Sequence, residues 1–386
     1  MLRRTRFRHY FWGVPAPCYS TNKLPQPPHV LFFGGDQFSC KTLQVLHSAP
    51  DVWGTISVVT SPDKVVGRRG RKEILEAPVK EVAKSLSLPL FFIPPSTVEF
   101  STWQPQEPFA TPSPANIILT ASFGKAIPSS VLSLFEPANR LNVHASLLPL
   151  YRGAAPIQRA IADGEQETGV SIVEMTHVSD DGRGFDVGRV WGQVPVAIPP
   201  GANYELMEHT LALQGGRLLV DLLRRRLASD VGAMEQNDAQ ATYAYKIKLA
   251  TARIDWDTWT ADKVGWTHRA FSHKRPLHTR ILKSGKRVAL LDVQSTTTPD
   301  SESTPHKRLP ELQYPGDASF DLSQTRSSYD QRGSILIRCA DASYVRVYRL
   351  QTENRDAVDA RAWWNGIRPE FLSDGVLKLG RIDGHD

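Results

Sequence analysis

In the first part of the chain, short apolar runs alternate with segments in which apolar residues recur at helical spacing. The runs that predict buried strands are Val30–Phe33, Thr55–Thr60, Leu90–Ile93, Asn116–Ala121 and Arg140–Val143. Between the first two runs, Phe38, Leu43 and Leu46 recur at helical spacing, and Pro78 begins a second helical pattern that ends near Leu86. This alternation of strands and helices predicts an α/β fold with a mostly parallel sheet.

The same pattern continues after one interruption. Residues 94–115 contain six prolines and predict a surface insertion. We expect two further strands at Gly169–Met175 and Val190–Ile198. Asn203 is placed to cap a helix that runs to about Leu227.

The periodicity changes after residue 227. Residues 228–245 are mixed and polar, and they predict a linker. Alternation typical of strands returns at Val288–Val293, Ser334–Arg338 and Tyr344–Leu350, while the low-complexity stretch 295–305 predicts a loop. We therefore expect an α/β domain over 29–227, a linker over 228–245 and a smaller β domain over 246–386.

Composition narrows the class of protein. The 386 residues are 41% hydrophobic and 22% charged, a balance typical of a folded soluble chain. No stretch approaches the roughly 20 consecutive apolar residues that cross a bilayer, so we expect no membrane partner. Three scattered cysteines predict neither a disulfide framework nor a zinc cluster, and they fit a reducing compartment.

Positive charge is concentrated at the N-terminus. Five basic residues and no acidic residue precede Asp36, and the rest of the chain is nearly neutral. An arginine-rich, acid-free N-terminus is typical of a mitochondrial transit peptide, which we expect over residues 1–28. A secretory signal is excluded because it needs an apolar core. The alternative is a disordered basic arm that contacts RNA.

The most distinctive segment is LNVHASLLPLYRGAAPIQRAI, residues 141–161. Because strand side chains alternate, Asn142 and His144 point to the same face. An amide beside an imidazole suits acyl transfer, since one can donate to an oxyanion and the other can move a proton. Asp186, in a Phe-Asp-Val-Gly turn, could orient the histidine. The alternative is a histidine with a purely structural role at a strand end.

Three other features are candidates for binding. Gly34 and Gly35 follow the first strand without G-x-G-x-x-G spacing, so we expect a tight turn and no nicotinamide cofactor. GRRGRK at 67–72 suits a mobile loop that contacts a phosphate backbone, with a solvated charge run as the alternative. Residues 263–291 carry eight cations and no acidic residue, which predicts RNA contact, with a solvated surface as the alternative.

These motifs resemble the methionyl-tRNA formyltransferase family from about Val30 to Leu372. The segments that carry the resemblance are FFGGDQF (32–38), SPDKVVGRRGRK (61–72), APVKEVA (77–83), ASFGKAIP (121–128), the segment 141–161, DGEQETGVSIVEM (163–175), FDVG (185–188) and TYAYKIKLATARIDW (242–256). Asn-x-His-x-Ser-Leu-Leu-Pro followed by Arg-Gly-Ala-Ala-Pro-Ile is highly specific to folate-dependent formyltransferases. The ARIDW element and the basic N-terminus are similar to the mitochondrial type.

The resemblance implies a Rossmann-like formyl-transfer domain with a parallel sheet, followed by a smaller OB-like β-barrel domain. The implied reaction moves a formyl group from 10-formyltetrahydrofolate to the α-amine of initiator methionyl-tRNA in the mitochondrial matrix, without a metal. We expect a monomer. The alternatives are a folate-dependent formyltransferase or hydrolase that acts on a small amine, and a catalytically silent RNA-binding relative.

The resemblance also implies roles for single residues. The implied catalytic trio is Asn142, His144 and Asp186. The implied folate-binding segment is Ser146, Leu147, Leu148 and Pro149. The tRNA-binding residues that we expect, from the basic loop and from the later cation run, are Arg68, Arg69, Arg71, Lys72, Lys274, Arg275, Lys283 and Lys286.

The chain departs from the family pattern near the site. Leu150 and Tyr151 stand where a basic residue and a tryptophan are usual. The turn before Asp186 is enlarged, so Asp180 and Asp181 are alternative catalytic carboxylates. The basic loop has one extra residue, so either Arg68 or Arg69 could make the leading contact with tRNA.

Overall fold

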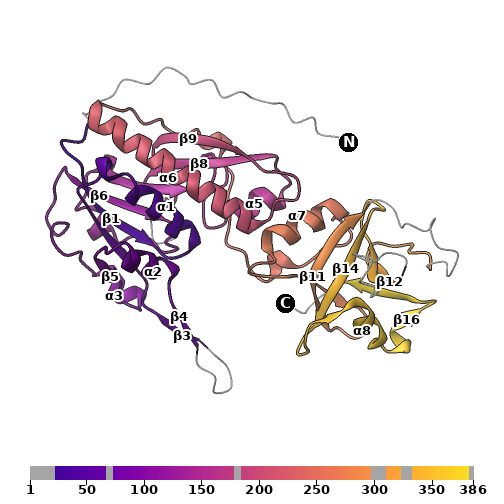
Figure 1. Cartoon of the computed structure of the whole chain (residues 1–386). Helices are drawn as coiled ribbons and strands as arrows, with labels where there is room; N and C mark the ends of the chain where they lie inside the picture. The colour runs from indigo at the N-terminus through magenta and orange to yellow at the C-terminus, as the bar shows by residue number, and fades with distance from the viewer. Residues whose placement is uncertain (1–21, 67–72, 178–183, 297–309, 323–332, 382–386) are drawn as a thin grey trace. The chain divides into compact units, whose positions relative to one another are not determined.

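The structure is a computed structural model that describes residues 22–66, 73–177, 184–296, 310–322 and 333–381 (Figure 1). Contacts divide the chain into two compact units, and each unit combines separated segments. The first unit consists of Met1–Arg152, Gly169–Val194 and Leu211–Ala241. The second unit consists of Gly153–Thr168, Pro195–Thr210 and Thr242–Asp386.

The first unit is built on a seven-stranded sheet, whose strand order is β5-β2-β1-β6-β7-β8-β9. Its strands are β1 (His29–Gly34), β2 (Thr55–Thr60), β5 (Leu90–Phe92), β6 (Asn116–Ala121), β7 (Arg140–His144), β8 (Glu167–Glu174) and β9 (Val190–Ala197). The strands from β5 to β7 pair in parallel, and β8 is antiparallel to β7. Strands buried on both faces must be apolar throughout, which is why they were visible as apolar runs. The predicted α/β class with a parallel-dominated sheet is confirmed.

Helices cover this sheet (Figure 1). They are α1 (Gln37–His47), α2 (Pro78–Ser85), α3 (Thr97–Ser101), α4 (Ser129–Leu132) and α6 (Tyr204–Ala228). The backbone N–H of Leu206 donates to Asn203 Oδ1 at 3.0 Å, which confirms the predicted cap of α6. A Cβ at Gly215 would lie 2.6 Å from Val143, so this glycine allows α6 to pack closely against β7.

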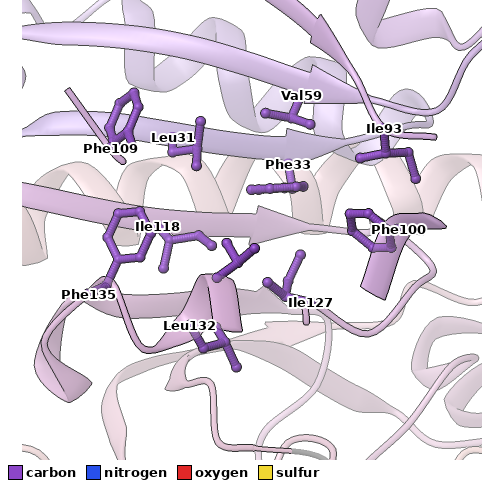
Figure 2. Packing of buried hydrophobic residues seen from close by; sticks show 11 residues of the cluster. Leu31, Phe33, Val59, Ile93, Phe100, Phe109, Ile118, Ile127, Leu132 and Phe135 are labelled. Carbon is purple, nitrogen blue, oxygen red and sulfur yellow. The ribbon is translucent and has the colours of Figure 1, made fainter. Parts of the chain in front are cut away.

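The proline-rich stretch 94–115 is not simply a surface insertion. Phe100 and Phe109 are 3% and 2% exposed, and both belong to a hydrophobic core cluster of the first unit (Figure 2). Phe100 packs edge-on against Phe123, with ring centroids 6.1 Å apart. The surface expectation was wrong for these residues because isolated phenylalanines between prolines show no helical or strand period.

Residues 22–28, which lie within the predicted leader, contact the end of α6. Leu24 is 2% exposed, and its backbone N–H donates to the Arg226 carbonyl at 2.7 Å. Arg226 Nε in turn donates to the Asn22 carbonyl at 2.8 Å. The folded contacts of the first unit therefore begin at Asn22 within the described residues.

The second unit contains a closed antiparallel barrel. Its strands are β10 (Leu277–Ile281), β11 (Arg287–Thr296), β12 (Asp317–Asp321), β13 (Ser334–Arg338), β14 (Tyr344–Thr352), β15 (Val358–Asp359), β16 (Leu372–Ser373) and β17 (Val376–Gly380). The order β10-β11-β14-β13-β12-β17 is closed by pairing of β10 with β17. The predicted barrel domain is confirmed, and closure leaves few free strand edges.

Three helices complete the second unit. They are α5 (Pro156–Ala162), α7 (Ala261–Phe271) and α8 (Ala360–Asn365). Lys263 Nζ on α7 donates to the Ala162 carbonyl at 2.7 Å and thereby ties α7 to the end of α5. In the described part of the chain, no helix has both the length and the apolar character needed to span a membrane.

Candidate active site

The end of β7 carries the two polar side chains that the sequence singled out. Asn142 Nδ2 donates to Asp186 Oδ1 at 3.0 Å, and His144 Nδ1 lies 3.5 Å from Asp186 Oδ2. One carboxylate therefore contacts both side chains, although Asp186 lies 44 positions after Asn142. The alternatives Asp180 and Asp181 lie outside the described residues.

The second ring nitrogen of His144 faces a backbone carbonyl. Nε2 lies 3.0 Å from the Tyr151 oxygen. A carbonyl oxygen only accepts, so Nε2 carries a hydrogen in this contact. Nδ1 faces the Asp186 carboxylate, so the ring lies between two hydrogen-bond acceptors. The side chain is 5% exposed, so a proton can be held at this strand end with little access to bulk water.

Asn142 has a defined orientation. Thr120 Oγ1 at the end of β6 donates to Asn142 Oδ1 at 2.8 Å, which turns Nδ2 toward Asp186. An amide group carries two hydrogens, and the contact with Asp186 uses one of them. The second hydrogen can donate to a ligand oxygen. The site thus combines an amide donor, a proton carrier and a carboxylate, the set that acyl transfer requires.

Asp186 lies in a tight turn directly above β8. Its φ is 58°, in the left-handed region that costs a non-glycine residue free energy. A Cβ at Gly188 would lie 2.1 Å from the Glu174 carbonyl, so only glycine allows this close approach. Gln236 Nε2 donates to the carbonyls of Asp186 and Gly188, each at 2.7 Å.

The segment after β7 is braced internally. Ser146 is fully buried, and its hydroxyl donates to the Leu150 carbonyl at 2.6 Å. The backbone N–H of Leu148 donates to Ser171 Oγ at 3.0 Å. We therefore expect any folate contact from this segment to come from its backbone and from the partly exposed Leu147 and Pro149.

A half-buried acid, Asp36, lies at the neighbouring strand ends. Asp36 follows β1, caps α1 with Ser39, and accepts a hydrogen bond from Ser122, which follows β6. Burial raises the pKa of Asp36 above its ordinary value, and the bonds from Ser122 and Ser39 oppose that shift. Gly34 is the last residue of β1 and Gly35 precedes the cap of α1; a Cβ at Gly34 would lie only 2.5 Å from Ser39 Cβ.

The expected RNA-binding loop, residues 67–72, lies outside the described residues. The two strands on either side of it are described. Arg68, Arg69, Arg71 and Lys72 fall in the stretch that the structure leaves out. Strands β3 (Lys64–Val66) and β4 (Glu73–Leu75) form an antiparallel hairpin that flanks this stretch. Lys80 on α2 contacts Asp63 at 2.5 Å and Glu76 at 3.2 Å, so one cation ties both ends of the hairpin.

The later cations do not form one group. Lys274 and Arg275 lie in the turn before β10, whereas Lys283 and Lys286 lie in the turn after it. Five strand residues at about 3.3 Å each separate the two turns by roughly 15 Å. Lys283 Nζ also donates to the Glu370 carbonyl at 2.9 Å, so part of the cation run stabilises the second unit.

Sequence reasoning missed the residues that hold the trio in place. Thr120 is an ordinary strand residue in the sequence, and Tyr151 contributes a backbone atom. Gln236 lay in a stretch predicted to be a linker. A polar amide in a polar segment gives no signal, so only tertiary contacts could identify it. Within the described ranges, no group of three or more histidine, cysteine or acidic side chains could hold a metal.

Comparison with known proteins agrees with this architecture. The formyl transferase model matches residues 29–223, and the model of the formyl transferase C-terminal domain matches residues 246–368. Methionyl-tRNA formyltransferase of Staphylococcus aureus (strain MW2) is 36% identical over 228 residues, which are 59% of this chain and 68% of the relative.

Two solved structures have a similar fold. An N-formyltransferase from Helicobacter canadensis, in complex with folinic acid and dTDP-3-aminofucose, matches with a TM-score of 0.50 and 14% identity, over 82% of this chain and 98% of that chain. The sugar 3N-formyl transferase WlaRD, solved with dTDP and 5-N-formyl-THF, matches with a TM-score of 0.51 and 14% identity, over 86% and 100%. At 14% identity, these two structures show only the fold. The family is shown by the first family model, which spans about half of the chain. The chain therefore belongs to the formyl transferase family of formyl-transferring enzymes.

Proposed function

We propose that this protein transfers the formyl group of 10-formyltetrahydrofolate to the α-amine of methionyl-tRNA. The observation that carries the proposal is the contact of one carboxylate, Asp186, with both Asn142 and His144 at the end of β7. The acceptor is supported by the 36% identity to a methionyl-tRNA formyltransferase. The donor is supported by the folinic acid and 5-N-formyl-THF in the two similar structures.

Each member of the trio has a distinct role in this reaction. 10-Formyltetrahydrofolate supplies an activated formyl carbon, to which the neutral amine of methionine adds. The second Nδ2 hydrogen of Asn142 donates to the formyl oxygen as that oxygen gains negative charge. The amine that adds to the carbon loses a proton to His144, while His144 gives its own proton to the folate nitrogen whose bond to carbon breaks. Asp186 stabilises the charged ring and holds the amide of Asn142 through the 3.0 Å hydrogen bond.

The cellular setting is part of the proposal. The arginine-rich, acid-free N-terminus supports import into the mitochondrial matrix, where formylated methionyl-tRNA would serve translation initiation. The basic loop 67–72, carried on a hairpin tied by Lys80, supports contact with the acceptor end of the tRNA. Charge reversal at Arg68 and Arg69 should raise KM for tRNA more than KM for folate, and equal effects on both would contradict this role.

A formyl transfer assay tests the reaction. Protein that begins at Asn22 is incubated with 10-formyltetrahydrofolate and methionyl-tRNA, and formyl-methionine is measured after deacylation. His144→Ala and Asn142→Ala should each lose at least about 10²-fold in kcat while still binding tRNA. His209→Ala, a change at an exposed histidine on α6, is the matched control and should keep normal turnover.

Parallel reactions separate the other functions. Free methionine and a panel of small amines, including a nucleotide-linked amino sugar, replace the tRNA. Transfer to a small amine alone, or hydrolysis of the donor alone, would move the function to a different formyltransferase or a hydrolase. Retained tRNA binding without any turnover would favour a silent RNA-binding protein.

A further inference from the structure

A buried arginine, Arg152, and Gln236 form a hydrogen-bonded pair next to the catalytic histidine. Arg152 is 3% exposed and donates through Nε and Nη2 to Gln236 Oε1, at 3.0 and 2.8 Å. Gln236 Nε2 donates onward to the carbonyls of Asp186 and Gly188, each at 2.7 Å. All of these residues belong to the first unit.

The chemistry of the partners allows only one orientation of the Gln236 amide. A guanidinium only donates, so it must meet the amide oxygen, and carbonyls only accept, so they must meet the amide nitrogen. Arg152 therefore determines where Gln236 directs its two hydrogens. The two hydrogens in turn hold the backbone of the turn that carries Asp186.

Arg152 and Gln236 are connected to the groups that face both nitrogens of the His144 ring. Arg152 directly follows Tyr151, whose carbonyl lies 3.0 Å from Nε2. Asp186, held through Gln236, lies 3.5 Å from Nδ1. The Tyr151 carbonyl and Asp186, which face the two ring nitrogens, are thus both held by Arg152 and Gln236.

The turn needs this support. Asp186 has a φ of 58°, a conformation that costs a non-glycine residue free energy. The two hydrogen bonds from Gln236 to the carbonyls of Asp186 and Gly188 oppose that strain. Without them, the backbone can relax to a conformation that directs the carboxylate elsewhere.

We infer that Arg152 and Gln236 are positioning residues, which set the distance between Asp186 and His144. The inference depends on the proposed function for its kinetic readout, because neither residue is proposed to touch a substrate. Gln236 lies in the stretch expected to be a linker, so the inference also assigns that stretch a part in catalysis.

Gln236→Glu is the sharpest test. The change keeps the length of the side chain and its acceptor oxygens for Arg152, but it removes both donors to the turn. A displacement of about 1 Å at a catalytic group costs up to about 10²-fold. We therefore expect kcat to fall 10- to 100-fold, with KM for both substrates changed less than about threefold. Gln240→Glu is the matched control, because it makes the same change at an exposed glutamine nearby and should leave kcat unchanged.

A double-mutant cycle separates positioning from a general loss of folding. In an Asp186→Ala background, Gln236→Glu should lower the residual kcat less than about twofold, because the group that it positions is gone. Thermal unfolding of each variant checks that the protein is folded, and Gln236→Met replaces Gln236→Glu if the latter does not fold. Normal kcat in the single variant, or an undiminished effect in the Asp186→Ala background, would overturn the inference.

A crystal structure of Gln236→Glu gives a readout that does not depend on the substrate. We expect Asp186 to leave contact with His144. An unchanged distance would overturn the positioning role even if the wild-type protein did not formylate methionyl-tRNA. Absence of transfer by the wild-type protein, by contrast, would overturn the proposed function and leave this structural test decisive.

Discussion

Removal of residues 22–28 should strongly destabilise the first unit, whereas removal of residues 1–21 should leave its described contacts intact. The perturbation compares a protein that begins at Asn22 with one that begins at His29. The shorter protein loses Leu24, which is 2% exposed, and the Asn22 carbonyl that accepts from Arg226.

The expected magnitude follows from these two losses. Burial of a leucine side chain contributes about 1.5–3 kcal/mol. A hydrogen bond to a charged group contributes about 1.5–3 kcal/mol, and a water molecule replaces it poorly here because Arg226 is only 2% exposed. The guanidinium keeps two acceptors, the Ala138 carbonyl and Asn139 Oδ1. The deletion should therefore cost about 3–6 kcal/mol of the 5–15 kcal/mol that a typical protein has.

Urea denaturation followed by fluorescence measures this difference. Leu24→Ala in the protein that begins at Asn22 isolates the leucine and should cost about 2–3 kcal/mol. If the free energy of unfolding of the protein that begins at His29 lies within about 1 kcal/mol of that of the longer protein, residues 22–28 contribute no core contact and the prediction is wrong.

Three shorter predictions concern single side chains. Burial raises the pKa of Asp36 above its ordinary value of 3.8, so the folded state binds this proton more tightly than the unfolded state and loses stability as the pH rises above 3.8. Asp36→Asn should therefore stabilise the protein more at higher pH, and a difference in Tm that is constant with pH would exclude this. Lys80→Met should loosen the hairpin base at Asp63 and raise KM for tRNA alone, and an equal rise in KM for folate would argue against it. Burial raises the pKa of the Cys339 thiol to about 12, so iodoacetamide at about pH 8 should label it only after denaturation, and rapid labelling of the native protein would contradict the burial.

The secondary-structure elements that could be predicted were those with a strong local pattern of hydrophobic and polar residues. Strands such as Asn116–Ala121 are buried along their whole length, so their sequence is mostly apolar and their type is visible without the fold. The cap at Asn203 is equally local, because it joins residues three positions apart. By contrast, Phe100 and Phe109 reach the core from a proline-rich stretch without periodicity, and closure of the barrel depends on a pairing between β10 and β17, about one hundred positions apart.

Within the site, the sequence by itself determined that Asn142 and His144 share one face, because side chains alternate along any strand. Which carboxylate meets them was decided only by the tertiary structure, since the contact with Asp186 spans 44 positions and depends on a turn of strained backbone. The support of that turn by Gln236, a further 50 positions along the chain, was also beyond sequence patterns. Hydrogen bonds between loops leave no period in the sequence, because the fold rather than the spacing brings their donors and acceptors together.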